Sequence, residues 1–137
     1  MTSPILLDTY ALIWLANGEP LRTSARAAVL EAGETEGRIL ASPISAWEIG
    51  QLASRGRLSL KLGVQEWFQQ VLASGVALAP MPPEVLIASS YLPAGSLRDP
   101  ADKVLAATAR TYRYRLMTRD RPLINFGAGG HLDVIPC

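Results

Sequence analysis

The chain alternates short apolar runs with longer stretches of helical periodicity, and this alternation limits its fold more than any other feature. Strands are expected at five runs, PILLD (4–8), RILASP (38–43), VALAPM (76–81), RLMTRD (115–120) and LDVIP (132–136). Short apolar runs separated by helices are typical of βαβ units, in which neighbouring strands are parallel. The sequence therefore predicts an α/β domain with a mainly parallel central sheet.

Helices are expected between these runs, at residues 9–18, 24–34, 45–56, 64–75, 82–93 and 98–113, with a turn or short helix at 121–127. Thr9 is a possible cap of the first helix. Ser45 with Glu48 three residues later has the pattern of a capping box. Asp99 is followed by Pro100, a combination typical of an N-cap and the first helical position.

The length and composition suit one domain over residues 1–137, because 137 residues can bury one core. The 13 basic and 12 acidic residues give a net charge of +1, which does not by itself indicate a nucleic-acid-binding protein. Eleven of the cations are arginines, whose planar guanidinium suits phosphates. One histidine, His131, and one cysteine, Cys137, exclude a cysteine or histidine metal cluster, and neither is expected to take part in catalysis.

No segment near the N-terminus has the pattern of a membrane anchor or a signal peptide. The longest apolar run there, residues 10–16, is too short to span a bilayer and lacks a basic flank. With a single cysteine, no disulfide can form within the chain, which fits a reducing compartment. A soluble cytoplasmic protein is therefore expected.

Five acidic residues lie where strands end or helices begin. Asp8 and Asp120 end two strands, Glu48 lies in the first turn of a predicted helix, and Asp99 and Asp102 open another. Right-handed crossovers bring such positions to the same edge of a parallel sheet, where ligands bind. The five acids are therefore expected to converge on one cleft.

Carboxylates gathered in this way need a compensating cation. Two of them about 4 Å apart repel by roughly 4 kcal/mol at an effective dielectric constant of about 20. Since no Cys or His cluster is present, the ligands are oxygen only, which favours Mg²⁺ or Mn²⁺ over zinc. Clusters of this kind often hydrolyse phosphodiesters, with the metal activating water and neutralising the leaving oxygen.

Each acid also has a purely structural explanation. Asp99 could serve only as a cap, and Asp102 could only favour the helix dipole. Glu48 could be the acid of a capping box, and Asp8 and Asp120 could be ordinary turn residues at strand ends. The metal-site hypothesis depends on the recurrence of the same sheet edge rather than on any one residue.

Four segments resemble the PIN-domain ribonucleases, and among them the VapC-type toxins of toxin–antitoxin pairs. The segments are ILLDTYALIWL, SPISAWEIGQLASRGRLSL, RDPADKVLAATAR and LMTRDRPL, and they follow the order of that family over nearly the whole chain. The resemblance implies a three-layer α/β/α sandwich and Mg²⁺- or Mn²⁺-dependent hydrolysis of RNA.

The resemblance also implies the site residues. Asp8, Glu48, Asp102 and Asp120 match the acidic quartet of the family, and Asp99 matches an additional metal-site acid in the branch with DPxDR-like motifs. Lys103 stands where that motif has arginine, which keeps the charge. Asp8, Asp102 and Asp120 would hold the ion, with Glu48 completing its shell or orienting the attacking water. Asp102 is favoured over Asp99 as the third acid.

Hydroxyls and cations beside these acids are candidates for contact with RNA. Thr9 and Thr118 could position water, or only cap and pack. The residues that flank the acids are candidates for binding the phosphates of the RNA, namely Arg98, Lys103, Thr118, Arg119 and Arg121. Arg55 and Arg57 form a second candidate patch. Core or interface packing is expected for the tryptophans, with base stacking as the alternative, at Trp14, Trp47 and Trp67.

The family resemblance implies protein partners as well. A VapB-type antitoxin would block the cleft, with an arginine reaching the carboxylates as a physically suitable inhibitor. A homodimer and a hetero-oligomer with the antitoxin are expected, and Trp14 and Leu15 are candidates for the dimer surface.

Two other functions were weighed against the toxin ribonuclease. One is a catalytically inactive PIN-fold domain that binds RNA or protein and keeps its acids for helix ends. The other is a Mg²⁺-dependent phosphatase, which the absence of a DxD pair at Asp8 disfavours. The sequence GxxxxGK[ST] does not occur, which argues against a nucleotide-hydrolysing motor.

Overall fold

The computed structural model describes residues 2–93, 95 and 97–137. Along the chain its elements are β1 (Ile5–Leu7), α1 (Thr9–Ala16), α2 (Thr23–Ala32), β2 (Ile39–Ala41), α3 (Pro43–Ser54), α4 (Val64–Ala73), β3 (Ala77–Leu78), α5 (Pro83–Ala88), α6 (Pro100–Tyr112), β4 (Arg115–Thr118), α7 (Arg121–Ala128) and β5 (Val134–Pro136). No helix in these ranges is long and apolar enough to cross a membrane.

The five strands form one parallel sheet in the order β3-β2-β1-β4-β5. Strand β1 is central, since Leu6 pairs with Leu40 on one side and with Leu116 on the other. After β1 the chain therefore adds β2 and β3 at one edge of the sheet, and only after α6 does it add β4 and β5 at the opposite edge. The predicted α/β class and parallel sheet are confirmed.

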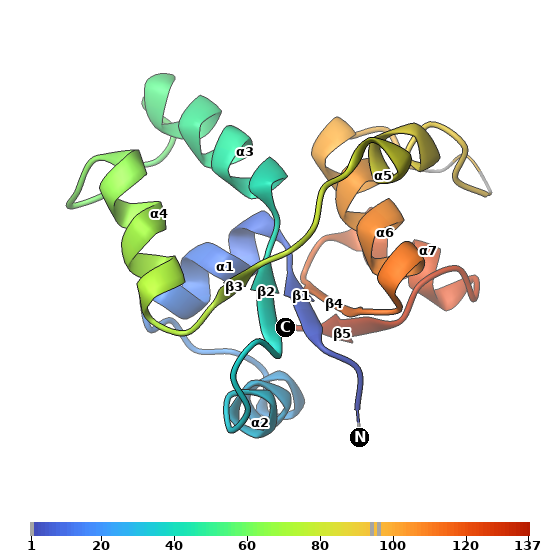
Figure 1. The fold of residues 1–137 in the computed structure, drawn as a ribbon, viewed down its shortest axis with the longest axis horizontal. Coiled ribbons are helices and arrows are strands. Elements are labelled where there is room, and N and C mark those ends of the chain that lie inside the picture. The colour runs from blue at the N-terminus through green and yellow to red at the C-terminus, as the bar shows by residue number, and fades with distance from the viewer. Residues whose placement is uncertain (1, 94, 96) are drawn as a thin grey trace.

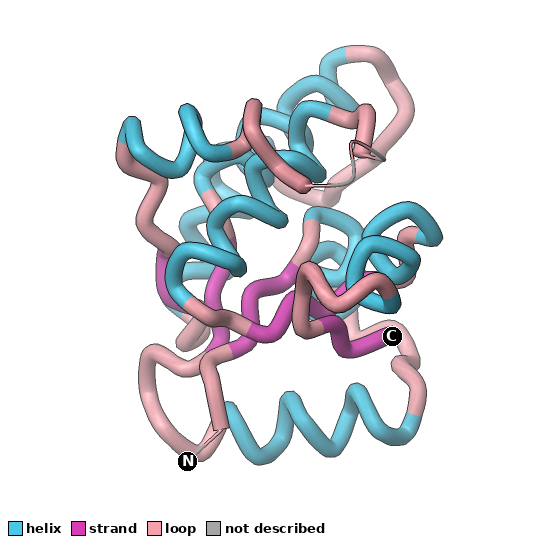
Figure 2. Tube along the Cα trace, turned by 90° about the vertical axis from the view of Figure 1, so that its right-hand side faces the viewer, coloured by secondary structure: helices cyan, strands magenta, loops and turns pink. Residues whose placement is uncertain are grey.

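Helices cover both faces of the sheet because successive strand residues point in opposite directions. Ile5 and Leu7 pack with residues of α1, α2 and α4, whereas Leu6 packs with residues of α6 and α7. In Figure 1, α3 and α4 lie on the left of the sheet and α5, α6 and α7 on its right. Figure 2 shows α2 below the sheet. This arrangement is a three-layer α/β/α sandwich.

The N-caps of three helices can be compared with the caps that the sequence predicts. Asp8 caps α1, so the expectation that Thr9 is the cap is wrong. Ser42 caps α3 and Pro43 is its first residue, so the predicted capping box of Ser45 and Glu48 is also wrong, and Glu48 lies in the second turn. The expected cap at Asp99 is confirmed.

The C-terminal part of α7 lies very close to β5. A Cβ atom added at Gly127 would lie 2.6 Å from Cγ2 of Val134 and 3.2 Å from the carbonyl oxygen of Leu132. Real Cβ atoms essentially never approach a neighbour at the first of these distances. Glycine at this position therefore allows the backbone of α7 to pack directly against the Val134 side chain of β5.

Candidate active site

The first acid of the site, Asp8, is held by hydrogen bonds from two elements. It follows β1 directly and is 5% exposed. Its Oδ1 accepts from the backbone N–H of Ala11 at 2.7 Å, and its Oδ2 accepts from the hydroxyl of Thr118 at the end of β4. The carboxylate is thus oriented both by its own helix and by the neighbouring strand.

The same Thr118 hydroxyl also joins Asp120 to the site. Thr118 is fully buried, and its Oγ1 accepts from the backbone N–H of Asp120 at 3.0 Å. Asp120 caps α7, because its Oδ2 accepts from the N–H of Leu123 at 3.3 Å. One hydroxyl therefore fixes two acids that follow adjacent strands.

Asp99 precedes α6 and Asp102 lies in its first turn, and the two acids have different roles there. Oδ1 of Asp99 accepts from the backbone N–H of Asp102 at 3.1 Å, which makes Asp99 the cap. The pKa of the Asp102 carboxyl is raised to about 8, chiefly by burial and then by the charges of Asp99, Asp120, Asp8 and Glu48, in that order. All of these influences act in the same direction.

Glu48 reaches the same region from α3. Burial raises the pKa of its carboxyl, a hydrogen bond with the Thr9 side chain opposes that rise, and the charges of Asp99 and Asp120 add to it. Thr9 is itself buried and shares a hydrogen bond of 3.0 Å with the Ser45 hydroxyl.

The structure brings all five predicted acids together. Burial is also the main cause that raises the pKa of Asp8, to about 6, while hydrogen bonds from Thr118 and Ala11 lower it and the charges of Asp120 and Glu48 raise it. Within the described residues, however, no three carboxylate, imidazole or thiol groups lie close enough together to hold a metal ion as they stand. The acids share one electrostatic environment, but they do not form a closed cage.

One flank of the acids is lined by aromatic rings and an arginine. A pocket of about 320 Å³ is bounded by Asp8, Tyr10, Trp14, Arg119 and Asp120. The Arg119 guanidinium lies 3.8 Å from the centroid of the Trp14 ring and donates to the carbonyl oxygen of Cys137 at 2.9 Å. This arginine is held beside the acids by a cation–π contact.

The other flank lies along α3 and includes the two arginines Arg55 and Arg57. A pocket of about 210 Å³ is lined by Trp47, Glu48, Gln51, Leu52, Arg55, Arg57, Asp99 and Pro100. Trp47 is 53% exposed, so core packing is the wrong expectation for this tryptophan, whereas Trp67 is buried as expected. Tyr10 and Gln51 were missed by sequence reasoning, although each follows a site residue at a short spacing along a helix.

The other predicted contacts with substrate occupy different environments. Arg98, Arg119 and Arg121 are exposed and Lys103 is half-buried. Thr118 lies in the interior, where its hydroxyl serves Asp8 and Asp120 rather than the surface.

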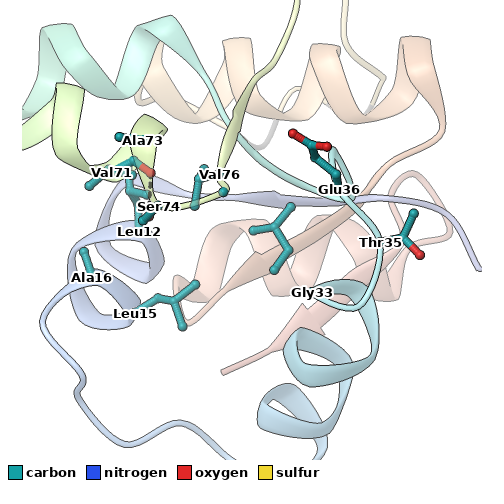
Figure 3. Close-up of a pocket in the computed structure, with 12 residues that line it drawn as sticks. Leu12, Leu15, Ala16, Gly33, Thr35, Glu36, Val71, Ala73, Ser74 and Val76 are labelled. Carbon is teal, nitrogen blue, oxygen red and sulfur yellow. Dashed lines mark hydrogen bonds between the residues drawn. The ribbon is translucent and has the colours of Figure 1, made fainter.

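A larger pocket, of about 650 Å³, lies away from the five acids between α1, the end of α2 and the end of α4 (Figure 3). Apolar side chains such as Leu12, Leu15 and Val76 line much of it, and Glu36 contributes a carboxylate to its wall. Its size does not make it the reaction site, because none of the clustered acids lines it.

Known proteins are similar to this chain in sequence and in fold. The family model described as PIN domain matches residues 5–128. Ribonuclease VapC22 from Mycobacterium tuberculosis is 35% identical over 119 residues, which cover 87% of this chain and 88% of that protein.

Two solved structures share the fold at low sequence identity. VapBC2 from Rickettsia felis, bound to a DNA fragment from its promoter, has a TM-score of 0.70 at 18% identity and covers 96% of this chain and 97% of that one. DNA-bound VapBC from Salmonella typhimurium has a TM-score of 0.66 at 17% identity, with 98% of each chain covered. The PIN-domain match and the 35% identity with Ribonuclease VapC22 establish that the chain belongs to the PIN-domain family and, within it, to the VapC-type proteins.

Proposed function

We propose that this protein is a metal-dependent endoribonuclease toxin that cleaves RNA phosphodiester bonds and is neutralised by a VapB-type antitoxin. The observation that carries the proposal is the gathering of five carboxylates from four parts of the chain. The pKa values of three of them, Asp8, Glu48 and Asp102, are raised by burial first and then by the charges of the others. The relative from Mycobacterium tuberculosis is named a ribonuclease, which supports RNA as the substrate.

The donor chemistry of the site fits Mg²⁺ or Mn²⁺. All candidate ligands are carboxylate oxygens, and the mutual repulsion of Asp102 with four other acids is what a divalent cation would relieve. Although no three groups in the described residues are tightly clustered, Mg²⁺ commonly takes one or two carboxylates directly and keeps several waters. An open set of acids is therefore compatible with this ion.

We assign the ion to Asp8, Asp102 and Asp120, with Glu48 completing the shell or orienting the attacking water. Asp99 uses Oδ1 as a helix cap, so its Oδ2 is the oxygen that it can offer to the metal or to a metal-bound water. When bound, the ion would activate water and neutralise charge on the leaving oxygen.

The chain's own residues would orient these ligands and hold the substrate. Thr118 is a positioning residue, because its hydroxyl fixes the Oδ2 of Asp8 and the backbone of Asp120. The phosphates of the RNA would be contacted by the cations around the acids, Arg98, Lys103, Arg119 and Arg121. Such contacts predict that Arg119→Ala weakens RNA binding and gives a shallower dependence of log Kd on log salt; an unchanged slope would remove this assignment.

Cleavage of a single-stranded RNA by the purified protein tests the proposal. We expect cleavage with Mg²⁺ or Mn²⁺, loss of cleavage in EDTA, and recovery when the metal is restored. Asp120→Asn should abolish cleavage. Asp133→Asn changes an exposed acid outside the cluster and should leave cleavage unchanged. Cleavage that persists in EDTA, or that survives in Asp120→Asn, would contradict the metal-site assignment.

The proposal includes a VapB-type antitoxin, a homodimer and a location in the cytoplasm. The two solved relatives are VapBC proteins, which supports an antitoxin partner. Expression of the chain alone should arrest growth, and co-expression with the product of a neighbouring antitoxin gene should restore it. The mass of the purified chain in solution would show whether it dimerises.

A catalytically inactive PIN-fold binding domain is the alternative, and one observation favours it. Asp8, Asp99 and Asp120 all cap helices, so they would be useful to the fold without any metal. RNA binding that is retained without detectable cleavage at any concentration of Mg²⁺ or Mn²⁺ would support this alternative.

A further inference from the structure

We infer that Trp47, Arg55 and Arg57 form a subsite for the RNA strand beside the bond that is cut. An unpaired base would stack on the Trp47 ring, and the neighbouring phosphates would contact the two guanidinium groups. This inference rests on the proposed function, because it takes the five acids to be the reaction centre.

The three side chains line up along one side of α3 and the turn after it. Trp47, Gln51 and Arg55 are spaced by four residues and therefore share a helix face about 12 Å long. The opposite face is the one that the fold uses, since Ser45 and Ile49 are fully buried. Trp47 thus faces solvent with half of its surface, although it belongs to the layer beside the sheet.

This face is continuous with the candidate reaction centre. Glu48 and Asp99, two of the five acids, line the same pocket as Trp47, Arg55 and Arg57. The pocket of about 210 Å³ is smaller than the roughly 300–1,000 Å³ that encloses a whole small-molecule ligand. Its size suits one unit of a polymer whose remainder lies outside.

The combination of residues favours single-stranded RNA over a protein partner. The phosphates of an RNA strand are repelled by the clustered carboxylates and need cations beside them. Arg55 and Arg57, both exposed, provide these cations on this flank. An exposed indole offers a stacking surface to a base that is not paired within a duplex. On the opposite flank, the guanidinium of Arg119 already covers a face of the Trp14 ring. Trp47 is therefore the tryptophan beside the acids that is best exposed for stacking.

Binding measured without cleavage tests the inference separately from the proposed function. A fluorescein-labelled single-stranded RNA of about ten nucleotides is titrated into the wild-type protein in EDTA, and in parallel into the Asp102→Asn variant. On both backgrounds we expect Trp47→Ala to weaken binding by about tenfold and to leave the salt slope unchanged. Trp47→Phe should stay within about threefold of the parent, because it keeps an aromatic face. Arg55→Gln and Arg57→Gln should each make the salt slope shallower by about 0.7.

Matched controls fix what each result means. Tyr91→Ala removes another exposed aromatic ring, 82% exposed and outside the pocket, and should leave RNA binding unchanged. The expected pattern supports the subsite even if the wild-type protein cleaves no RNA, which would contradict only the proposed function. RNA cleavage and binding that are unaffected by Trp47→Ala and by the two arginine changes would overturn the subsite while leaving the function in place. A loss of dimerisation or antitoxin binding in Trp47→Ala with normal RNA binding would also overturn it.

Discussion

The starts of α1 and α6 each present an aspartate to the same site, but their environments differ. Asp8 is 5% exposed and Asp102 is only partly buried, yet the pKa of Asp8 is raised to about 6 and that of Asp102 to about 8. The more buried acid has the smaller shift because Thr118 and Ala11 donate hydrogen bonds to it. The influences on Asp102 all raise its pKa.

This difference shows which acid the fold explains and which it does not. A carboxylate that caps a helix and accepts a hydrogen bond from a hydroxyl contributes to the fold. These hydrogen bonds stabilise its charged form when it is buried. Asp102 is not the cap of α6, since Asp99 has that role. We therefore expect Asp102 to be the acid that depends most on a bound cation.

The largest expected effect is the loss of cleavage in Asp102→Asn. Removing the least compensated ligand should lower the rate of RNA cleavage by at least about a thousandfold, or roughly 4 kcal/mol in the barrier. The variant should melt at least as high as the parent at pH 8 in EDTA, because a destabilising charge is gone. Initial rates and thermal unfolding measure the two effects, and cleavage within threefold of the parent would contradict the role given to Asp102.

Asp8→Asn should also abolish most cleavage, by about a hundredfold or more, but with the opposite effect on stability. Asparagine can still cap α1, yet its amide cannot accept hydrogen bonds at both positions that Ala11 and Thr118 now serve. We expect the free energy of unfolding to fall by about 1 kcal/mol. If urea denaturation shows Asp8→Asn and Asp102→Asn to change stability in the same direction, the distinction between the two helix starts fails.

The pH dependence of stability should follow from the two raised pKa values. Between about pH 4 and pH 8 the folded protein binds more protons than the unfolded chain, so stability in EDTA should fall as the pH rises through this range. From Asp102 alone we expect about 2 kcal/mol, less than complete burial would give because this carboxyl is partly solvated. Mg²⁺ should raise the melting temperature more at pH 8 than at pH 5. A melting temperature that rises with pH in EDTA would be inconsistent with these values.

The smallest effect is expected for Asp99→Asn. The amide keeps an oxygen for the N–H of Asp102, so the cap and the melting temperature should be preserved. Cleavage should fall by about tenfold, since Oδ1 of Asp99 is engaged in the cap and only Oδ2 can serve the proposed metal. A loss as large as that of Asp102→Asn would make Asp99 the principal acid of α6 instead.

Much of the fold could be predicted from the sequence because it depends on local patterns. The alternation of apolar runs and helical stretches indicated the parallel sheet, and the position of acids after strands indicated the cluster. Strand ends were predicted too long, since Asp8 and Ser42 begin to cap helices immediately after their strands. At the start of α3 the pair Ser42 and Pro43 replaced the expected Ser45, because a proline at the first helical position favours the earlier start.

The contacts inside the site could not be predicted, because they depend on which strands are neighbours. Thr118 can reach Asp8 only since β4 lies directly beside β1, although 110 positions separate the two residues. Whether Trp47 faces the core or solvent likewise depends on which face of α3 packs inward, and this is the face with Ser45 and Ile49. The assignment of metal ligands and of contacts with RNA stays a prediction until it is measured.

The contact between Gly127 and β5 connects a distant part of the chain to the chemistry. Asp120 and Gly127 stand at opposite ends of α7, about 10 Å apart along its axis. A single extra methyl group at Gly127 would lie 2.6 Å from Cγ2 of Val134, so either this side chain or the helix would have to shift. Because Asp120 caps this helix, we expect a substitution at Gly127 to affect the candidate site by displacing α7.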